Sequence, residues 1–194
     1  GYSKNEIEFI DEVSGAPEWQ LQEGKPLGAY LLYETDGVFY DQSEIDANAV
    51  DYSQVTPQLR PGDLRLVDYD GNGKIDADDQ VRQEDSFTPR LQYGITLDMS
   101  YKNFDLSILF QGSQGGMTTL FNGEFGDWGN YYKYQHDNRW SIDNPSREHP
   151  RLASRGDTWY TDGGYGNNTY NYGSTDYLRL KNIELGYTLP QDVF

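Results

Sequence analysis

The stretch RLQYGITLDMSY, residues 90–101, alternates apolar and polar residues without interruption. A period of two is the pattern of a β-strand with one apolar and one polar face. The predicted strand is longer than the roughly 5–6 residues of a typical globular strand. It reaches the roughly 9–11 residues that a tilted membrane strand needs. The chain is therefore expected to fold around long, two-faced β-strands.

A second alternating run, FDLSILFQG at residues 104–112, follows the short polar link KNF, with Leu109 as its one exception. Two alternating runs joined by a tight link indicate a β-hairpin. Either this hairpin packs one face on the core of a soluble sandwich, or that face contacts lipid, with Tyr101 and Phe104 at a membrane interface. In the second case the lipid-facing residues are Leu91, Tyr93, Ile95, Leu97, Met99, Phe104, Leu106, Ile108 and Phe110.

A third strand is predicted in YLRLKNIELGYTLP, residues 177–190, where Pro190 ends the run by removing a backbone donor. Its two halves are out of phase: Leu178 and Leu180 do not alternate with Ile183 and the residues that follow it. Either a β-bulge lies near Lys181 and Asn182, or the side chains of residues 177, 179 and 181 share the outward face at the interface. The sequence leaves both open.

Long segments, residues 11–89 and 113–176, alternate with the short link KNF. Compact soluble domains rarely contain such long loops, whereas outer-membrane barrels have short turns on one side and long loops outside. Within the first segment, LGAYLLYETDGVFY favours local strands, and DQSEIDANAV favours a short helix capped at or near Ser43. A weaker strand is expected within residues 1–10. No apolar run approaches the roughly 20 residues of a membrane-spanning helix.

The second long segment is rich in large aromatic side chains, which either grip a partner or pack within an ordered layer of loops. Both long segments are expected to lie outside the cell and to shape a substrate vestibule and a partner surface. The aromatic residues are Trp128, Tyr131, Tyr132, Tyr134, Trp140, Trp159 and Tyr160.

The charge balance restricts the kinds of partner. Asp and Glu number 32 against 15 Lys and Arg, which gives a formal charge of −17, so nucleic acid is not expected as a partner and cations are. There is no cysteine. The two histidines, His136 and His149, fit no familiar metal or triad spacing. We therefore expect that the chain is not an enzyme and assign no catalytic residue.

The acidic stretch DYDGNGKIDADD, residues 68–79, has the oxygen spacing of a calcium loop. Gly73 permits its sharp turn, and position 12 holds an Asp in place of the usual bidentate Glu, which shortens its reach. No convincing helix flanks the loop, so a structural calcium ion is expected outside an EF-hand. The alternative is an acidic turn without an ion. The predicted ligands are Asp68, Asp70, Asn72, the Lys74 carbonyl, Asp76 and Asp79.

Three stretches, LRPGDLRLVDYDGNGKIDADDQV, TPRLQYGITLDMSYKNFDLSILFQGSQG and YLRLKNIELGYTLP, resemble in this order the C-terminal part of SusC/RagA-type TonB-dependent outer-membrane transporters. GAYLLYETDGVFYDQSEIDA is similar to a segment that precedes them in that family. The resemblance covers most of the chain.

The resemblance implies an all-β fold: part of an antiparallel up-and-down transmembrane β-barrel with long extracellular loops. Residues 1–194 would form part of its C-terminal region and contain no plug domain. The implied protein lies in the cell outer membrane, contacts membrane lipid and imports glycans or peptides. Its implied partners are a SusD-type surface lipoprotein and, through an N-terminal part, the TonB complex.

Two other functions remain open. The first is a secreted module with a calcium-braced β-fold that binds carbohydrate. The second, a secreted hydrolase, has the least support, because among this many carboxylates a glycosidase-like pair arises by chance.

Overall fold

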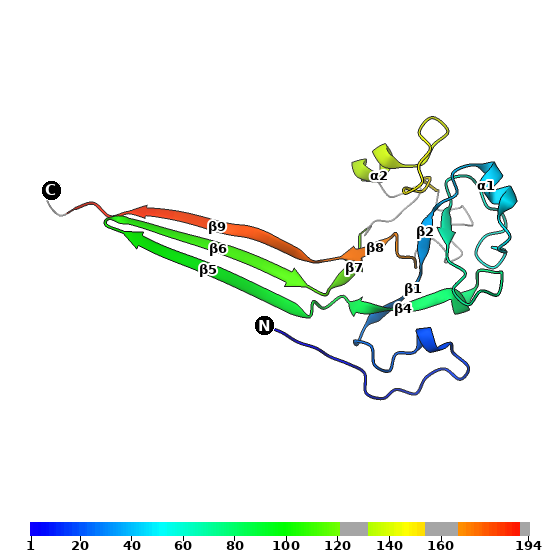
Figure 1. Cartoon of the computed structure of the whole chain (residues 1–194), viewed down its shortest axis with the longest axis horizontal. Coiled ribbons are helices and arrows are strands. Elements are labelled where there is room, and N and C mark those ends of the chain that lie inside the picture. The colour runs from blue at the N-terminus through cyan, green and yellow to red at the C-terminus, as the bar shows by residue number, and fades with distance from the viewer. Residues whose placement is uncertain (121–131, 154–166, 191–194) are drawn as a thin grey trace.

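A computed structural model describes residues 1–120, 132–153 and 167–190. Figure 1 shows a long sheet at one end of the molecule and a layer of short strands and helices at the other. The described parts of both long segments fold at the same end of the long sheet, and the short link lies at the opposite end (Figure 1). The sorting of the connections by length, expected from the sequence, is thus present in the fold.

The long sheet is three-stranded and antiparallel, in the order β5-β6-β9. Its strands are β5 (Leu91–Tyr101), β6 (Phe104–Gln114) and β9 (Tyr177–Tyr187). Tyr101 pairs with Phe104, so only Lys102 and Asn103 form the hairpin loop. Lys102 has a φ of 54°, a positive value of the kind that tight two-residue hairpin loops require. The predicted hairpin and third strand are confirmed.

A β-bulge in β9 accounts for the change of phase in its sequence. Leu109 pairs with Asn182, but the next residue of β6, Phe110, pairs with Leu180, so Lys181 is the extra residue. The bulge allows Leu178 and Leu180 to share a face with Ile183. Of the two alternatives left by the sequence, the bulge is correct.

The N-terminal residues add little to this sheet. Tyr2 forms one antiparallel bridge with Leu91, but no strand is assigned within residues 1–10. The expected weak strand is therefore wrong apart from this bridge, because the chain turns away and bonds to its own loop instead, for example from the Ile7 N–H to the Lys25 carbonyl.

The remaining elements are short and lie in the layer of loops. Three two-stranded pairings join segments distant in sequence: β1 (Ala29–Tyr33) with β4 (Gln80–Ser86), β2 (Thr35–Val38) with β3 (Leu64–Leu66), and β7 (Met117–Thr119) with β8 (Tyr172–Ser174). The helices are α1 (Gln42–Ala47) and α2 (Lys133–Asn138), with 3₁₀ turns η1 (Glu18–Gln20) and η2 (Ala77–Asp79). No described helix is long and apolar enough to cross a membrane.

The predicted short helix is α1, and its cap lies two residues before Ser43. The side chain of Asp41 accepts the N–H of Glu44 at 3.1 Å. The Glu44 carboxylate in turn accepts the N–H of Tyr40. A carboxylate at an N-cap satisfies a backbone donor that the helix leaves free.

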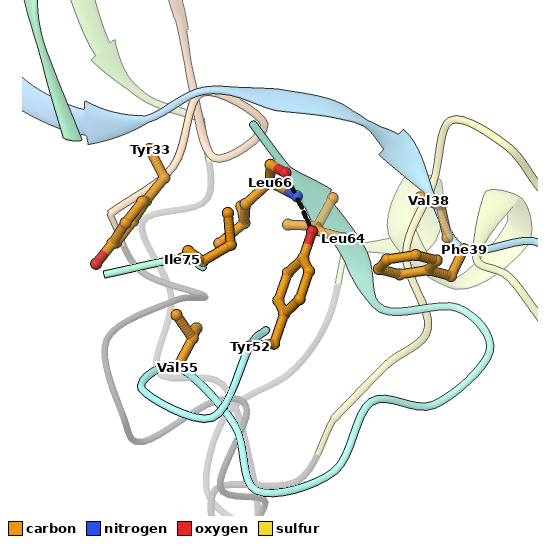
Figure 2. Packing of buried hydrophobic residues seen from close by; sticks show 8 residues of the cluster. All are labelled: Tyr33, Val38, Phe39, Tyr52, Val55, Leu64, Leu66 and Ile75. Carbon is orange, nitrogen blue, oxygen red and sulfur yellow. Dashed lines mark hydrogen bonds between the residues drawn. The ribbon is translucent and has the colours of Figure 1, made fainter. Parts of the chain in front are cut away.

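The hydrophobic core lies in the layer of loops and not in the long sheet. Figure 2 shows eight of its side chains, and the hydroxyl of Tyr52 both accepts the Leu66 N–H and donates to the Leu66 carbonyl. Trp140 and Tyr170, from the second long segment, pack against this cluster. The core residues are Tyr33, Val38, Phe39, Tyr52, Val55, Leu64, Leu66 and Ile75.

Candidate membrane face and candidate metal centre

Residues paired across an antiparallel sheet point to the same face, so the register defines two faces of the long sheet. Ile95 pairs with Phe110 and Leu97 with Ile108, and Ile108 also pairs with Ile183. The same register places all nine residues predicted to face lipid on one side. We call this side the apolar face: Leu91, Tyr93, Ile95, Leu97, Met99, Tyr101, Phe104, Leu106, Ile108, Phe110, Leu178, Leu180, Ile183, Leu185 and Tyr187.

The apolar face is largely open. Leu185 is 71% exposed and Leu178 65%, and Ile95, Met99 and Ile183 are also exposed. None of the buried hydrophobic residues in the described part of the chain belongs to β5, β6 or β9. A soluble sandwich requires strands that cover a core. The long strands of this chain cover none among the described residues.

Aromatic rings gather at the hairpin end of the apolar face. Tyr101 and Phe104 flank the link, and the ring centroids of Phe104 and Tyr187 are 4.7 Å apart. Aromatic residues at the ends of membrane strands form the girdles that mark the bilayer interface.

Tyr93 lies toward the other end of the apolar face, over Gly112, its partner in β6. An added Cβ on Gly112 would meet the Tyr93 ring at 2.2 Å.

The opposite side of the long sheet, the polar face, contains charged and amide groups. Asp98, Asp105 and Glu184 lie on it, and the Arg179 guanidinium donates to Gln111 Oε1 at 2.9 Å. Leu109 is the apolar exception, as its sequence position predicts. An apolar face backed by a polar face is the pattern of a strand between lipid and a water-filled lumen.

The acidic loop connects β3 to β4 beside the hydrophobic core. Ile75 in the loop is completely buried, and its N–H donates to the Asp51 carbonyl at 2.7 Å. On the outer side of the loop, the Trp19 indole donates to the Asp78 carbonyl and Gln20 donates to the Ala77 carbonyl. The loop is thus held from two directions.

Three of the predicted calcium ligands converge. Carboxylate oxygens of Asp68, Asp70 and Asp79 lie within 4.8 Å of one another. Gly73, with a φ of 86°, permits the turn that brings its own N–H to Asp68 Oδ2 at 2.8 Å. Hard oxygens at this spacing suit a calcium ion.

Asp79 is the buried member of this cluster. Its Oδ1 accepts the Tyr69 N–H at 2.7 Å, and its Oδ2 accepts the Asp76 N–H at 2.8 Å. Burial nevertheless raises the pKa of Asp79 above its ordinary value, outweighing these hydrogen bonds, and the charge of Asp70 adds to the rise. A cation beside Asp79 would oppose this effect.

The other predicted ligands make different contacts. Asp76 pairs with the Lys74 ammonium, which together with the Asp78 N–H lowers the pKa of Asp76. Asn72 Oδ1 accepts the Lys74 N–H at 3.0 Å. The structure therefore brings together Asp68, Asp70 and Asp79, while Asp76 is directed to Lys74 and not to the cluster of three.

The aromatic residues of the second long segment divide into two groups among those described. Trp140 packs against the core, and its indole N–H donates to the Tyr40 carbonyl at 2.8 Å. Tyr132 and Tyr134 are exposed. The other four predicted residues, Trp128, Tyr131, Trp159 and Tyr160, lie outside the described residues.

The two histidines do not form a catalytic arrangement with each other in the described structure. His149 Nδ1 lies 3.0 Å from the Tyr170 hydroxyl, and His136 Nδ1 lies 3.3 Å from Asp137. The sequence places Gln111 on the polar side of β6, and Ser113 continues the same alternation to the loop end of this strand, but the pattern alone assigns neither residue a function.

The fold and the two faces define a class: an all-β protein whose long antiparallel strands have the amphipathic pattern of membrane strands. No family model matches the chain. The chain is 32% identical over 190 residues to TonB-dependent receptor P3 of Formosa agariphila, and 30% identical over 186 residues to TonB-dependent receptor P26 of the same organism. Each match covers 94% of this chain and 18% of the relative, so the chain spans less than a fifth of their length.

Solved structures show the same fold. A RagAB peptide importer in the open-open state matches with a TM-score of 0.53 at 21% identity, covering 95% of this chain and 18% of that chain. A RagAB peptide transporter structure matches with a TM-score of 0.53 at 24% identity, covering 89% and 18%. The resemblance to TonB-dependent receptors seen in the motifs is confirmed by these relatives, and the chain shares the fold of part of the RagAB structures. These relatives are named as receptors and importers, which agrees with the expectation that the chain is not an enzyme.

Proposed function

We propose that residues 1–194 form part of the C-terminal region of an outer-membrane nutrient importer and supply three strands to the wall of its barrel. The observation that carries this proposal is the open apolar face of β5, β6 and β9. Large exposed apolar patches mark membrane or partner surfaces, and strands of 11 residues match the roughly 9–11 of tilted membrane strands. The polar face then lines the lumen.

Further strands of the transporter are part of the proposal. β5 and β9 are the outer strands of the long sheet, and unpaired strand edges invite pairing with other strands. Three strands cannot close a barrel. The runner-up, a secreted carbohydrate-binding module, would need another part of the chain to cover the apolar face, and the described core lies elsewhere.

A pair of arginine substitutions tests the membrane face. Ile108 and Ser107 are neighbours in β6 on opposite faces. In the transporter that contains these residues, Ile108→Arg should lose about 2–4 kcal/mol of folding free energy in lipid vesicles, because the charge would lie near the middle of the bilayer. Ser107→Arg should assemble almost normally. Equal effects of the two substitutions would contradict the assignment of the faces.

The second part of the proposal concerns cargo and partners. The solved neighbours are described as peptide importers. We propose that this transporter imports a glycan or a peptide, and that the TonB complex supplies the energy for import. A SusD-type surface lipoprotein would cover the mouth that the two long segments form outside the cell. Exposed apolar side chains there, Tyr132, Tyr134 and Ile142, suit such a contact.

Ile142 offers a test of the lipoprotein contact, because it is 87% exposed and its replacement should not disturb the fold. Ile142→Asp should reduce co-purification of the lipoprotein with the transporter, while Ile142→Val should leave it unchanged. Undiminished co-purification of the Asp variant, in a correctly assembled transporter, would remove Ile142 from the contact.

The third part of the proposal is a structural calcium ion in the acidic loop. Asp68, Asp70 and Asp79 would hold it, and the spacing supplies Asn72 and the Lys74 carbonyl as further oxygens. Asp76, the remaining predicted ligand, would have to turn away from Lys74 to join them. The ion would balance the buried charge of Asp79 and brace the loop, which Ile75 fixes to the core. Its role is mechanical, since no pair of long helices flanks the loop.

A further inference from the structure

An open depression of about 390 Å³ lies on the polar face of the long sheet, in the half nearer the layer of loops. Gln92 and Gly94 of β5 and Gln111 of β6 line it, and the register places all three on the polar face. Its volume is within the roughly 300–1,000 Å³ of ligand sites. Where the polar face lines the proposed lumen, this depression lies in the outer half of the lumen wall.

The bulge in β9 brings a lysine to this depression. Lys181, the extra residue of the bulge, lines the depression together with Gln92 and Gln111, so its side chain is on the polar face. β-bulges commonly redirect a side chain in this way. Lys181 and Gln92 are exposed and Gln111 is half-buried, so a ligand in the depression can reach all three.

Arg179 is the second cation at this depression. Its guanidinium lies over the Tyr177 ring at 5.1 Å and donates to Gln111 Oε1 at 2.9 Å. The guanidinium is therefore held one hydrogen bond away from the depression that Gln111 lines. An arginine has five N–H donors, and the bond to Gln111 uses one of them, so further donors can serve a ligand.

The two cations have no acidic partner in the described part of the chain, although Asp and Glu outnumber Lys and Arg by 32 to 15. Neither Arg179 nor Lys181 forms an ion pair with a carboxylate there. Glu184, which follows them in β9, accepts Asn182 Nδ2 at 2.6 Å instead.

The acidic groups of the polar face lie nearer the hairpin. Asp98 and Glu184 are both paired with Ser107, and Asp105 follows the hairpin loop directly after Phe104. The polar face is thus positive in its outer half and negative in its inner half. An anion would be attracted to the depression and repelled from the part of the wall beyond it.

The chemistry of this site suits a carboxylate. A planar guanidinium matches the two oxygens of a carboxylate, and an ammonium adds a compact charge with rotatable donors. Because Gln111 Oε1 already accepts from Arg179, the amide nitrogen of Gln111 is the group that can donate to a ligand. Gln92 offers a second amide beside it. A single exposed ion pair contributes little, so the site depends on both cations and on these amides.

We propose that this depression binds a carboxylate group of the cargo through Lys181 and Arg179, an inference that rests on the proposed import function. The carboxylate belongs to a uronic acid residue of a glycan or to the C-terminus of a peptide. The site selects acidic cargo in the outer half of the lumen, ahead of the acidic inner half.

Paired probes test this proposal with the purified transporter. The probes are oligosaccharides of galacturonic, glucuronic, mannuronic and guluronic acid, each beside its neutral methyl ester, and tripeptides, each beside its C-terminal amide. At least one acid should bind more tightly than its neutral partner, and added salt should weaken that preference. The kind of acid that binds identifies the source of the carboxylate.

Three substitutions locate the site. Lys181→Gln and Arg179→Gln should each weaken binding of the acid about tenfold, the lower end for a hydrogen bond to a charged group because the site is open. Lys181→Arg should retain it. Lys102→Gln removes the same charge in the hairpin loop, at the opposite end of the sheet, and is the matched control. The melting temperature should stay unchanged, because the replaced side chains are exposed.

The outcomes are distinct. A preference for the acid that falls in both site variants and not in the control supports the carboxylate site. Equal binding of every acid and its neutral partner overturns it, as does a preference that the site variants leave intact or that Lys102→Gln reduces equally. A transporter that assembles and takes up cargo while failing this test loses the site and keeps the proposed function. Failure of Ile108→Arg to differ from Ser107→Arg, by contrast, would undermine the function itself.

Discussion

At the scale of single residues, Asp79 is the buried member of the proposed cation site in the acidic loop. It is completely buried and accepts two short backbone hydrogen bonds, yet burial still raises its pKa. Burial therefore makes Asp79 harder to ionise in the folded loop than a free carboxyl, and a positive charge beside it would oppose this effect. Lys74 is not that charge, because it pairs with Asp76.

Calcium should stabilise the loop through Asp70, and Asp70→Asn should remove much of this effect. For a site with a dissociation constant of about 10⁻⁴–10⁻³ M, about 10 mM calcium should stabilise the bound loop by about 1.4–2.7 kcal/mol. This stabilisation can be measured from the amide hydrogen exchange of the loop in the transporter. Asp78→Asn changes the same charge outside the cluster and should keep the calcium response; loss of response in both variants would point to a general charge effect.

The pH dependence of the same loop follows from the sign of the Asp79 shift. A carboxyl whose pKa is raised by folding contributes stability below its ordinary pKa of 3.8, and this contribution is lost as the pH rises through the raised value. Without calcium, protection of the loop amides should therefore fall across this window. With calcium the ionised form has a partner, so the fall should shrink. Asp79→Asn should abolish the difference between the pH profiles with and without calcium. Identical profiles with and without calcium in the unsubstituted protein would contradict this prediction.

At the scale of elements, the bulge in β9 keeps the apolar side chains of both halves of this strand on the apolar face. Lys181 is the extra residue, and the ladder is regular on both sides of it. Deleting Lys181 should leave Leu178 and Leu180 on the apolar face, because Leu180 then precedes Asn182 directly in a regular ladder. The transporter should still assemble in the outer membrane.

Deletion of Ser107 is the matched control for this prediction. β6 pairs with β5 without any register shift, so a one-residue deletion there moves half of the strand to the wrong face. Assembly should fail. If the Lys181 deletion also failed while its expression remained normal, the bulge itself would be required and not merely tolerated.

Some elements can be predicted from the sequence and others cannot, for physical reasons. Strict alternation predicts β5 and β6, because an apolar or polar side chain indicates the face of the strand on which it lies. It cannot encode the bulge, since one phase break fits either a bulge or a change of face. It also cannot encode the pairing of β1 with β4, whose strands are separated by residues 34–79. In the acidic loop the spacing located the cluster of Asp68, Asp70 and Asp79, but not the turn of Asp76 toward Lys74.

At the scale of the whole molecule, the two long segments form one packed layer at the end of the sheet. The Arg151 guanidinium pairs with the buried Asp63 at 2.6 Å, and Arg147 pairs with Glu44 at 2.6 Å. The Tyr33 N–H donates to the Asn167 carbonyl at 2.8 Å. In the proposed transporter, a mouth built from two segments so joined would hold cargo and partner surfaces in fixed positions better than long independent loops would.

Trp140 is the residue through which this joining can be tested. It comes from the second segment, packs on the core of the first and donates to the Tyr40 carbonyl. Because it is only partly buried, Trp140→Ala should destabilise the layer by about 2–3 kcal/mol, below the roughly 3–5 kcal/mol of a fully buried Trp. Tyr132→Ala, at an exposed position of the same segment, should change stability by less than about 0.5 kcal/mol. Hydrogen exchange should then rise in both long segments of the Trp140 variant while β5 and β6 remain protected. Exchange confined to residues near 140 would show that the two segments fold independently, and would leave the mouth of the transporter as two separate loops.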